Sequence, residues 1–353
     1  MHDPSVEKQY VQWRQRYLRS YHDGLYVYYK EPSEHSDAMT CSEAHGYGML
    51  ISVLKRNQAD FDGLYRYFIR FRNHKGLMQW QQKRSHSGEF VPGDEGGTNC
   101  ATDGDVDICT ALFLAAKVWG HGGQHGEINY RQTAVDLCAA IHKHCIHPQT
   151  HMPLIGDWTE HGSKEYRLSR PSDFILSGFH LFYMEDKERQ HQWSQTIHAI
   201  LNTCQQQLHF SQSGLIADFL QENGGHYQPV HGEVLESKHD GDYNWNSCRV
   251  PWRLGHYYML TRDERIRPVL EAEAHFFAQQ VQKGEIKAGY HLNGHSFVDY
   301  TDMAFMAPVS FLFWVLGWQG QLHQLLNQMN DAEMTYFGES IAMLCLLMAN
   351  VPY

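Results

Sequence analysis

The chain has 353 residues, of which 42% are hydrophobic and 13% aromatic, and this composition is typical of a globular protein with a large core. Its formal net charge of −11 at pH 7 and the lack of any basic stripe argue against nucleic acid as a partner, because phosphate binding needs a basic face. No segment approaches the roughly 18 apolar residues of a membrane span, and residues 1–10 lack the apolar region of a signal peptide.

The eight cysteines and 25 histidines show no metal-binding pattern. There is no Cys-x-x-Cys pair, and most cysteines fall within apolar helical patterns, so we expect buried free thiols rather than disulfides or a structural zinc site. The segment "HGGQH" (121–125) lies in a glycine-rich connection and is predicted to be a loop. The sequence therefore predicts neither a metal site nor a cofactor.

Helical spacing of apolar residues runs along nearly the whole chain, whereas strand-like alternation is almost absent. Ser42 is expected to cap one helix, and Gly284 to end another. The predicted helices cover residues 4–21, 42–57, 59–73, 104–119, 127–146, 172–184, 187–208, 246–260, 263–283, 301–316, 319–330 and 335–349.

Long connections recur after every second or third predicted helix, at 74–103, 147–171, 209–245 and 285–300, and most other connections are short turns. Long ordered loops in a compact domain usually carry function. The alternation predicts helical hairpins arranged in a ring, with the long loops collected at one end. No low-complexity linker interrupts the chain, so we expect one domain over residues 1–353.

Three alternating acids, Asp103, Asp105 and Asp107, open the predicted helix at 104–119. An EF-hand calcium loop is excluded, because its sixth position would be Ile108 rather than Gly and its twelfth would be Leu114 rather than Glu. A diphosphate–magnesium site would need a second, facing acidic cluster of the D-D-x-x-D kind, and none is present. The remaining interpretation is carboxylate chemistry.

Glycoside hydrolysis needs one carboxylic acid to protonate the leaving oxygen and a carboxylate that activates water on the opposite face of the sugar. A like charge beside the acid raises its pKa and keeps it protonated near neutral pH. Sugars also stack on aromatic rings, and Trp80, Trp158, Trp245 and Tyr300 occur in the same segments as the acids. Glu43 lies at another predicted helix start, where Gly46 and Gly48 suit the close approach of a second backbone or a ligand.

The segments "SEAHGYGM" (42–49) and "ATDGDVDICTALFLAAKVW" (101–119) resemble two signature segments of glycoside hydrolase family 8, with Cys109 where Ala is usual. The stretches "GDW", "RPSDF", "NSCRVPWR" and "YTDMAFMAP" resemble further blocks of that family, in the expected order. The resemblance spans nearly the whole chain. It implies an all-α fold, an (α/α)6 barrel of about twelve helices, and hydrolysis with inversion.

The resemblance implies roles for individual residues. Glu43 matches the general acid, and Asp103 matches the acid that holds the sugar at the cleavage subsite. Trp158 matches a stacking residue and Arg249 the first Arg of the R-x-P-W-R block. Tyr47, Trp80, Asp105, Trp245, Asn246 and Tyr300 are further expected to form the substrate site. Asp105 would support Asp103, and Asp107 would compensate the helix dipole.

In one branch of the family the general base is an Asp three residues before the Arg that Arg249 matches. This chain differs from that branch. Asn246 stands there, and an amide cannot take a proton from water. The departure resembles the branch of chitosanases, lichenases and some endoglucanases, in which a loop Glu is the base. Glu236, in the long 209–245 segment, is the match, with Glu233, Asp240 and Asp242 as alternatives in the same loop.

These observations predict an inverting endo-hydrolase of a β-1,4-linked polysaccharide, either chitosan or a β-glucan such as lichenan or cellulose. Xylan and a bacterial exopolysaccharide are alternative substrates. A non-catalytic glycan-binding barrel and a metal-dependent helical enzyme such as a lyase are alternative functions. We expect a monomer without cofactor, secreted or periplasmic after trimming, with a cytoplasmic location as the alternative.

Overall fold

The computed structural model describes residues 4–353, and within that range it contains the twelve helices that the sequence predicts. They are α1 (Pro4–Tyr17), α2 (Ser42–Leu54), α3 (Gln58–Arg70), α4 (Thr102–Trp119), α5 (Tyr130–Cys145), α6 (Leu176–Glu185), α7 (Gln190–Gln207), α8 (Val250–Thr261), α9 (Arg267–Lys283), α10 (Met303–Leu316), α11 (Gln319–Met329) and α12 (Tyr336–Asn350).

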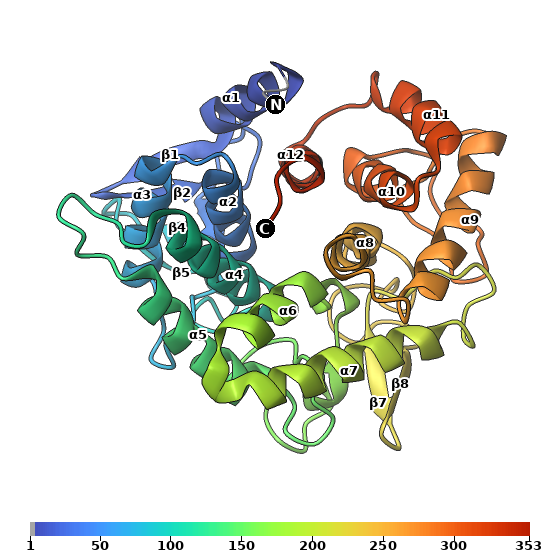
Figure 1. Cartoon of the computed structure of the whole chain (residues 1–353), viewed down its shortest axis with the longest axis horizontal. Helices are drawn as coiled ribbons and strands as arrows, with labels where there is room; N and C mark the ends of the chain where they lie inside the picture. The colour runs from blue at the N-terminus through green and yellow to red at the C-terminus, as the bar shows by residue number, and fades with distance from the viewer. Residues whose placement is uncertain (1–3) are drawn as a thin grey trace.

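The helices form two concentric rings (Figure 1). The even-numbered helices α2, α4, α6, α8, α10 and α12 make the inner ring, in which each packs against the next and α12 closes onto α2. Each odd-numbered helix packs outside an inner one. This arrangement is an (α/α)6 barrel, and the predicted fold class is confirmed.

The residue pattern explains which helices are inside. Every residue of α2 except Glu43 is buried, whereas Leu325 is the one buried residue of α11. A helix that is apolar on all sides needs neighbours all round, and a helix with one apolar stripe suits the outer ring. Glu43, whose side chain is 22% exposed, is therefore the residue of α2 that is most open to solvent.

Two glycines let α2 and α4 approach closely. A Cβ on Gly46 would lie 2.8 Å from the Cβ of Asp107, and one on Gly104 would lie 2.7 Å from the carbonyl carbon of Ser42. Real Cβ atoms do not approach so closely, so larger residues would push the helices apart. The close approach expected at Gly46 is confirmed, and it brings the first turns of the two helices together.

Eight short strands were missed by the sequence analysis. They are β1 (Leu18–Tyr21), β2 (Gly24–Val27), β3 (Ala38–Cys41), β4 (Gln81–Arg84), β5 (Phe90–Pro92), β6 (Leu168–Ser169), β7 (Leu220–Asn223) and β8 (His226–Pro229). They pair antiparallel in sheets β1-β2, β3-β4-β5 and β6-β7-β8. Segments of two to four residues are too short to show alternation, and β1 occupies the end of what was predicted as a helix to residue 21.

The predicted cap at Ser42 is wrong. Cys41, the last residue of β3, holds the N-cap position with φ −135° and ψ 165°, and Ser42 is already the first residue of α2. The backbone N–H of Ser42 donates to the carbonyl of Trp80 at 2.8 Å, so the pairing of β3 beside β4 replaces a side-chain cap.

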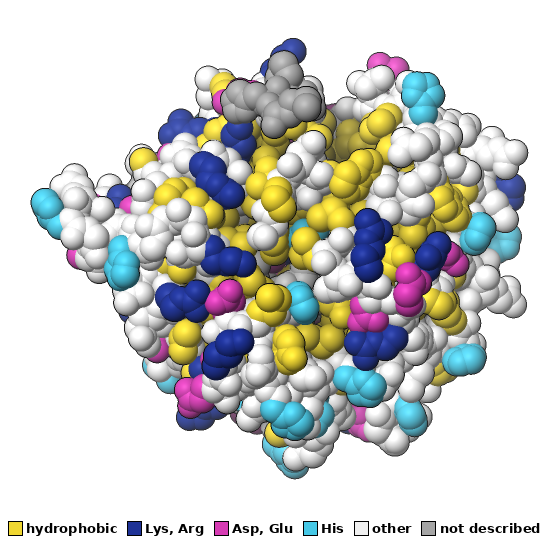
Figure 2. Space-filling view, viewed as in Figure 1, with side chains coloured by type: hydrophobic (Ala, Val, Ile, Leu, Met, Phe, Trp, Pro, Cys, Tyr) yellow, Lys and Arg dark blue, Asp and Glu magenta, His cyan; other side chains and the backbone are white. Residues whose placement is uncertain are grey.

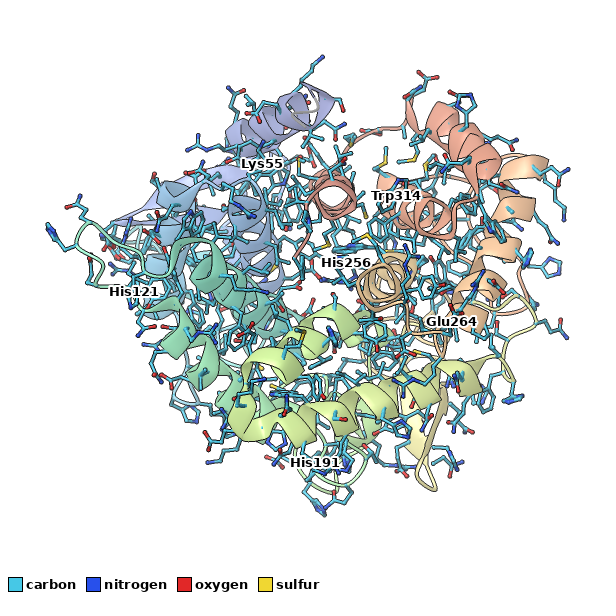
Figure 3. The ribbon with its side chains drawn as sticks, viewed as in Figure 1. Lys55, His121, His191, His256, Glu264 and Trp314 are labelled. Atoms are coloured by element: carbon cyan, nitrogen blue, oxygen red, sulfur yellow. The ribbon has the colours of Figure 1, made fainter. Side chains whose placement is uncertain are left out.

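The expectations about the cysteines and about residues 121–125 are confirmed. All eight cysteines are buried and free, and residues 121–125 lie in the connection between α4 and α5. Figure 3 shows His121 in that connection at the rim, and His256 of α8 near the middle of the barrel. Among residues 4–353, no helix combines the length and apolarity needed to cross a membrane.

An apolar cavity of about 420 Å³ opens between α10, α11 and α12. Figure 2 shows hydrophobic side chains gathered on the viewed face over this part of the barrel. Trp314, labelled in Figure 3, lines the cavity and is 39% exposed.

Candidate active site

The candidate site lies where three inner-ring segments begin. Glu43 is in the first turn of α2, Asp103 is in the first turn of α4, and Arg249 ends the short 3-10 helix η4 (Ser247–Arg249) that leads into α8. The long connections before α4 and α8 reach this same end of the barrel. The expected collection of long loops around the acids is therefore what the structure shows for two of these three segments.

Arg249 joins the acids. Its Nη1 donates to Glu43 and lies 3.6 Å from Asp103 Oδ2, and its side chain is only 4% exposed. Its Nη2 donates to Asn246 Oδ1 at 2.9 Å. The Asn246 amide in turn donates from Nδ2 to Glu236 Oε2 at 2.7 Å. A continuous path of hydrogen bonds thus runs from Glu43 to Glu236 through two intervening side chains.

Burial raises the pKa of Glu43 to about 7. The positive charge of Arg249 opposes the rise, and the negative charge of Asp103 adds to it. A carboxylic acid with a pKa near neutrality is populated in both protonation states at physiological pH. Glu43 can therefore donate a proton where an ordinary surface glutamate could not.

Four loop acids were candidates for the second carboxylate, and their surroundings differ. Asp240 is buried, and its carboxylate accepts the backbone N–H groups of Val234, Leu235, Glu236 and Ser237 at 2.8–3.0 Å. Asp242 is held by two histidine side chains. Glu233 is exposed. Of the four, only Glu236 bonds to Asn246, and its side chain is 46% exposed to solvent.

Asp218 fixes the turn that carries Asn246. Its buried carboxylate accepts the backbone N–H groups of Asn244, Asn246 and Ser247 at 2.9, 3.2 and 2.7 Å. Burial raises its pKa to about 7 despite these donors. Asp218 and Asp240 therefore hold opposite sides of the Asn246–Glu236 contact, and both act through backbone donors.

Two predicted aromatic residues share a pocket with Glu236. Trp80 and Trp158 line a cavity of about 420 Å³ together with Arg170, Leu235 and Glu236. Arg170 Nη2 bonds to Glu236 Oε1 at 3.0 Å. The cavity thus has two indole rings and a charged pair, which is the arrangement expected for a sugar subsite beside a reacting carboxylate.

The remaining predicted residues are more dispersed. Trp245 is 38% exposed and packs edge-on against Phe305 at 5.0 Å. Tyr300 is 53% exposed, in the connection before α10. Within residues 4–353, no hydrogen bond or ring contact joins its side chain to the acids. Tyr47 and Asp105 are fully buried, so neither presents a free surface to a ligand. Asp105 accepts the backbone N–H of Met78 at 2.9 Å.

The expectation that Asp107 only compensates the helix dipole is wrong. Asp107 is buried, and its carboxylate accepts hydrogen bonds from Arg253. Nη1 donates to Oδ1 at 3.0 Å and Nη2 donates to Oδ2 at 2.5 Å. Such a two-pronged pair is strongly directional. The pair joins α4 to α8 across the barrel. Arg253 contacts the Asp107 carboxylate where water would surround an exposed acid.

The buried pair belongs to a second layer beneath the first. Glu43, Asp103 and Arg249 form the upper layer; Tyr47, Asp107 and Arg253 lie four residues further along the same three segments. Residues four apart share a helix face, one turn apart. Arg249 reaches down to the Tyr47 hydroxyl at 3.4 Å, and the Arg253 guanidinium lies 5.9 Å from the Tyr47 ring. This repeated spacing is a signal that the sequence analysis did not use.

Arg170 and Asp173 were not singled out from the sequence, although both lie in the quoted "RPSDF" block. Asp173 is buried, and neither carboxylate oxygen has a hydrogen-bond partner among the described residues. Burial raises its pKa well above the usual range, and Asp103 adds to the rise. Asp173 is therefore a buried carboxyl group whose charged form is disfavoured by burial and by the nearby Asp103.

Known proteins resemble this chain in sequence and in fold. The chain resembles a beta-glucanase of Niallia circulans, 34% identical over 319 residues that cover 87% of this chain and 74% of the relative. Endoglucanase A of Acetivibrio thermocellus is 29% identical, over 87% of this chain and 61% of its own length.

Among solved structures, the apo beta-1,3-1,4-glucanase from Paenibacillus sp. X4 superposes with a TM-score of 0.88 at 30% identity, covering 98% of this chain and 91% of that one. A cold-adapted family 8 xylanase shares the fold, with a TM-score of 0.80 at 16% identity over 98% of this chain and 91% of its own. The family model described as glycosyl hydrolases family 8 matches residues 4–350. With its barrel, its acids and this match over nearly the whole chain, the protein belongs to glycoside hydrolase family 8 and is a glycoside hydrolase.

Proposed function

We propose that the protein cleaves a β-glucan containing β-1,4 linkages, within the chain and with inversion, using Glu43 as general acid and Glu236 as general base. The observation that carries the proposal is the hydrogen-bonded path Glu43–Arg249–Asn246–Glu236. It couples two carboxylates with different surroundings at the mouth of the barrel while keeping them apart.

The two surroundings suit the two roles. Glu43 has a pKa raised to about 7 by burial, so a protonated fraction is available to the leaving oxygen. Glu236 is 46% exposed, so water can reach its carboxylate, and Arg170 Nη2 contacts its Oε1 at 3.0 Å. An acid and a base with opposed environments are what general acid–base hydrolysis requires.

Separation of the acids supports inversion. An inverting enzyme needs about 6.5–9.5 Å between its carboxyl groups so that a water molecule can stand between the base and the sugar. Here two side chains, Arg249 and Asn246, lie between Glu43 and Glu236 along the hydrogen-bonded path. We therefore expect the carboxyl groups of Glu43 and Glu236 to lie within the inverting range rather than at the roughly 5 Å of a retaining pair.

Asp103, Arg249 and Asn246 are proposed to position the sugar at the cleavage point, with Trp80, Trp158, Trp245 and Tyr300 as stacking surfaces along the cleft. Tyr47 and Asp105 are fully buried, so we propose that they support Arg249 and the 76–80 segment rather than touch the substrate. The remaining orientation would come from Trp80 and Trp158, whose cavity adjoins Glu236.

A neutral glucan fits the charges better than chitosan. Glu43 is paired with Arg249 and Glu236 with Arg170, so the site offers little unpaired negative charge to ammonium groups. The relatives named beta-glucanase, endoglucanase and beta-1,3-1,4-glucanase point the same way. We also propose that the ring, closed by α12 on α2, is a single catalytic domain that acts as an exported monomer.

The test is a reducing-sugar assay on lichenan, carboxymethylcellulose, xylan and chitosan. We expect hydrolysis of lichenan, and a loss of about 10²–10⁴-fold or more in Glu43→Gln and in Glu236→Gln with binding retained. Glu233→Gln, in the same loop and exposed, is the matched control and should keep full activity. Substrate binding without any hydrolysis would favour the glycan-binding barrel instead.

The stereochemical claim has its own measurement. Proton NMR of the first products of lichenan should show the α-anomer before mutarotation if the enzyme inverts a β-linkage. Initial release of the β-anomer would overturn inversion and, with it, the assignment of Glu236 as a base that activates water.

A further inference from the structure

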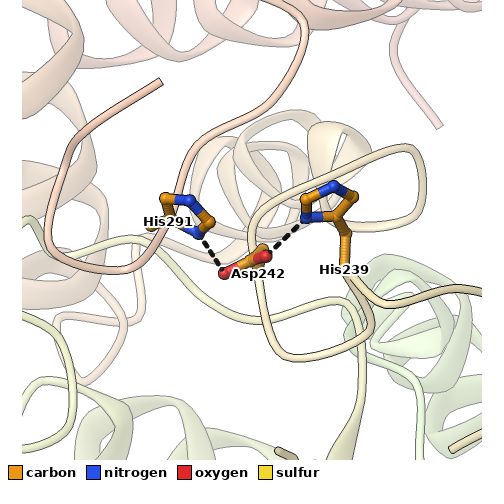
Figure 4. Close-up of side chains that lie close together, drawn as sticks. All are labelled: His239, Asp242 and His291. Atoms are coloured by element: carbon orange, nitrogen blue, oxygen red, sulfur yellow. Dashed lines mark hydrogen bonds and ion pairs between the residues drawn. The ribbon is translucent and has the colours of Figure 1, made fainter. Parts of the chain in front are cut away.

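A cluster outside the hydrogen-bonded path joins two loops. Asp242 lies in the loop that follows Glu236, and its two carboxylate oxygens contact His239 Nδ1 at 2.8 Å and His291 Nδ1 at 2.9 Å (Figure 4). His239 belongs to the same loop as Asp242, whereas His291 comes from the connection between α9 and α10. The three side chains are partly exposed, His239 at 21%, Asp242 at 17% and His291 at 46%.

The backbone holds this cluster in place. Tyr243 and Tyr290 exchange two backbone hydrogen bonds of 2.9 Å, so the residues next to them, Asp242 and His291, are fixed side by side. The His239 ring stacks on Phe297 with centroids 3.8 Å apart and planes 5° apart. The backbone pairing therefore fixes where Asp242 and His291 start, and the stacking on Phe297 fixes the His239 ring.

We propose that His239, Asp242 and His291 form a zinc site that fastens the Glu236 loop to the 285–300 connection. Two imidazoles and one carboxylate are a common Zn²⁺ ligand set, and the partly exposed side leaves the fourth position to water. In the cluster His239 and His291 present Nδ1 inward, and each neutral ring can move its proton to Nε2 when the metal binds.

The dimensions need only a small adjustment. Tetrahedral Zn–N bonds of about 2.1 Å place two ligand nitrogens about 3.4 Å apart, and the candidate ligand atoms all lie within 4.8 Å of one another. His291, the most exposed of the three, can supply the difference by rotating its side chain. Nitrogen ligands also select zinc over magnesium and calcium, which prefer oxygen.

The test is titration of Zn²⁺ into chelator-stripped full-length protein by isothermal calorimetry at pH 7.5. We expect one site per chain, with affinity at least tenfold weaker in His239→Ala and in His291→Ala. His295→Ala, an exposed histidine of the same connection, is the control and should bind as the unmodified protein does. Magnesium should give no saturable heat at this site.

Half-exposed His291 makes His291→Ala the deciding variant, since its loss removes little packing; thermal melting without zinc checks that it is folded. Binding should weaken at pH 5.5, because protonated imidazoles no longer bind metal. Absence of saturable zinc binding, or unchanged affinity in folded His291→Ala, would overturn the proposal. Because the readout is zinc affinity and not hydrolysis, failure here leaves the proposed function untouched.

Discussion

The side-chain amide of Asn246 donates a hydrogen bond of 2.7 Å to Glu236 Oε2. An amide at this position can orient the carboxylate but cannot itself take a proton. The contact therefore places residue 246 within one hydrogen bond of the oxygen that we propose as the base.

Moving the carboxylate across this contact should move the base. We expect Glu236→Gln to lose nearly all lichenan hydrolysis. The double variant Glu236→Gln/Asn246→Asp should be at least tenfold more active than Glu236→Gln. Initial rates measure the effect, with Asn246→Asp alone as the reference. A double variant as inactive as Glu236→Gln would contradict the idea that a carboxylate at 246 can reach the same water.

The acid should set the alkaline limb of the pH profile. With the pKa of Glu43 at about 7, kcat/KM should fall as pH rises above about 7, because the proton donor is lost. Asp103 contributes to this raised pKa through its like charge. In Asp103→Asn the alkaline limb should therefore shift to lower pH, along with lower activity. A limb that stays in place would show that Asp103 does not contribute to the raised pKa of Glu43.

Asp240 should matter for turnover although it touches no substrate. Its carboxylate accepts four backbone N–H groups of residues 234–237, and Asn would put an amide N–H against some of them. We expect Asp240→Asn to lower kcat more than tenfold with KM changed less than threefold, because Glu236 loses its position. The thermal midpoint, measured beside it, should fall only slightly. A large fall in the thermal midpoint together with the fall in kcat would indicate a purely structural role.

The buried Asp107–Arg253 pair, unlike Asp240, should act mainly on the stability of the fold. Removing one partner leaves the other charge buried and unpaired, which costs about 3–5 kcal/mol. We expect Asp107→Asn to lower the free energy of unfolding in urea by about that amount. Asp136→Asn, on the exposed face of α5, should change it by less than about 0.5 kcal/mol. Comparable values for the two variants would refute the assignment.

Much of this fold was predictable because its helices are long and strongly patterned. The inner helices are apolar on nearly every side and the outer ones on one stripe, so all twelve were found. The strands of two to four residues were missed, because such short segments show no periodicity of their own. The end of α1 was misplaced for the same reason, since pairing with β2 turns residues 18–21 into a strand.

The site divides in a similar way. Glu43, Asp103, Arg249 and Asn246 were identified from short family-like segments, and the structure brings them together. The partner of Asp107 was not foreseen, because the Asp107–Arg253 contact joins segments 146 positions apart. Asp240 was considered only as an alternative base. Its role as an acceptor for backbone N–H groups depends on loop geometry, which residue types alone do not specify.

The closure of the inner ring has a consequence for biosynthesis. Within the inner ring, the neighbours of α2 are α4, made early, and α12, made from residues 336–350. A ribosome-bound chain that lacks those residues leaves one side of the helix carrying Glu43 exposed, together with its apolar surface. Native packing around the acid is thus among the last events of folding, and a stalled or truncated chain should be insoluble and inactive rather than partly active.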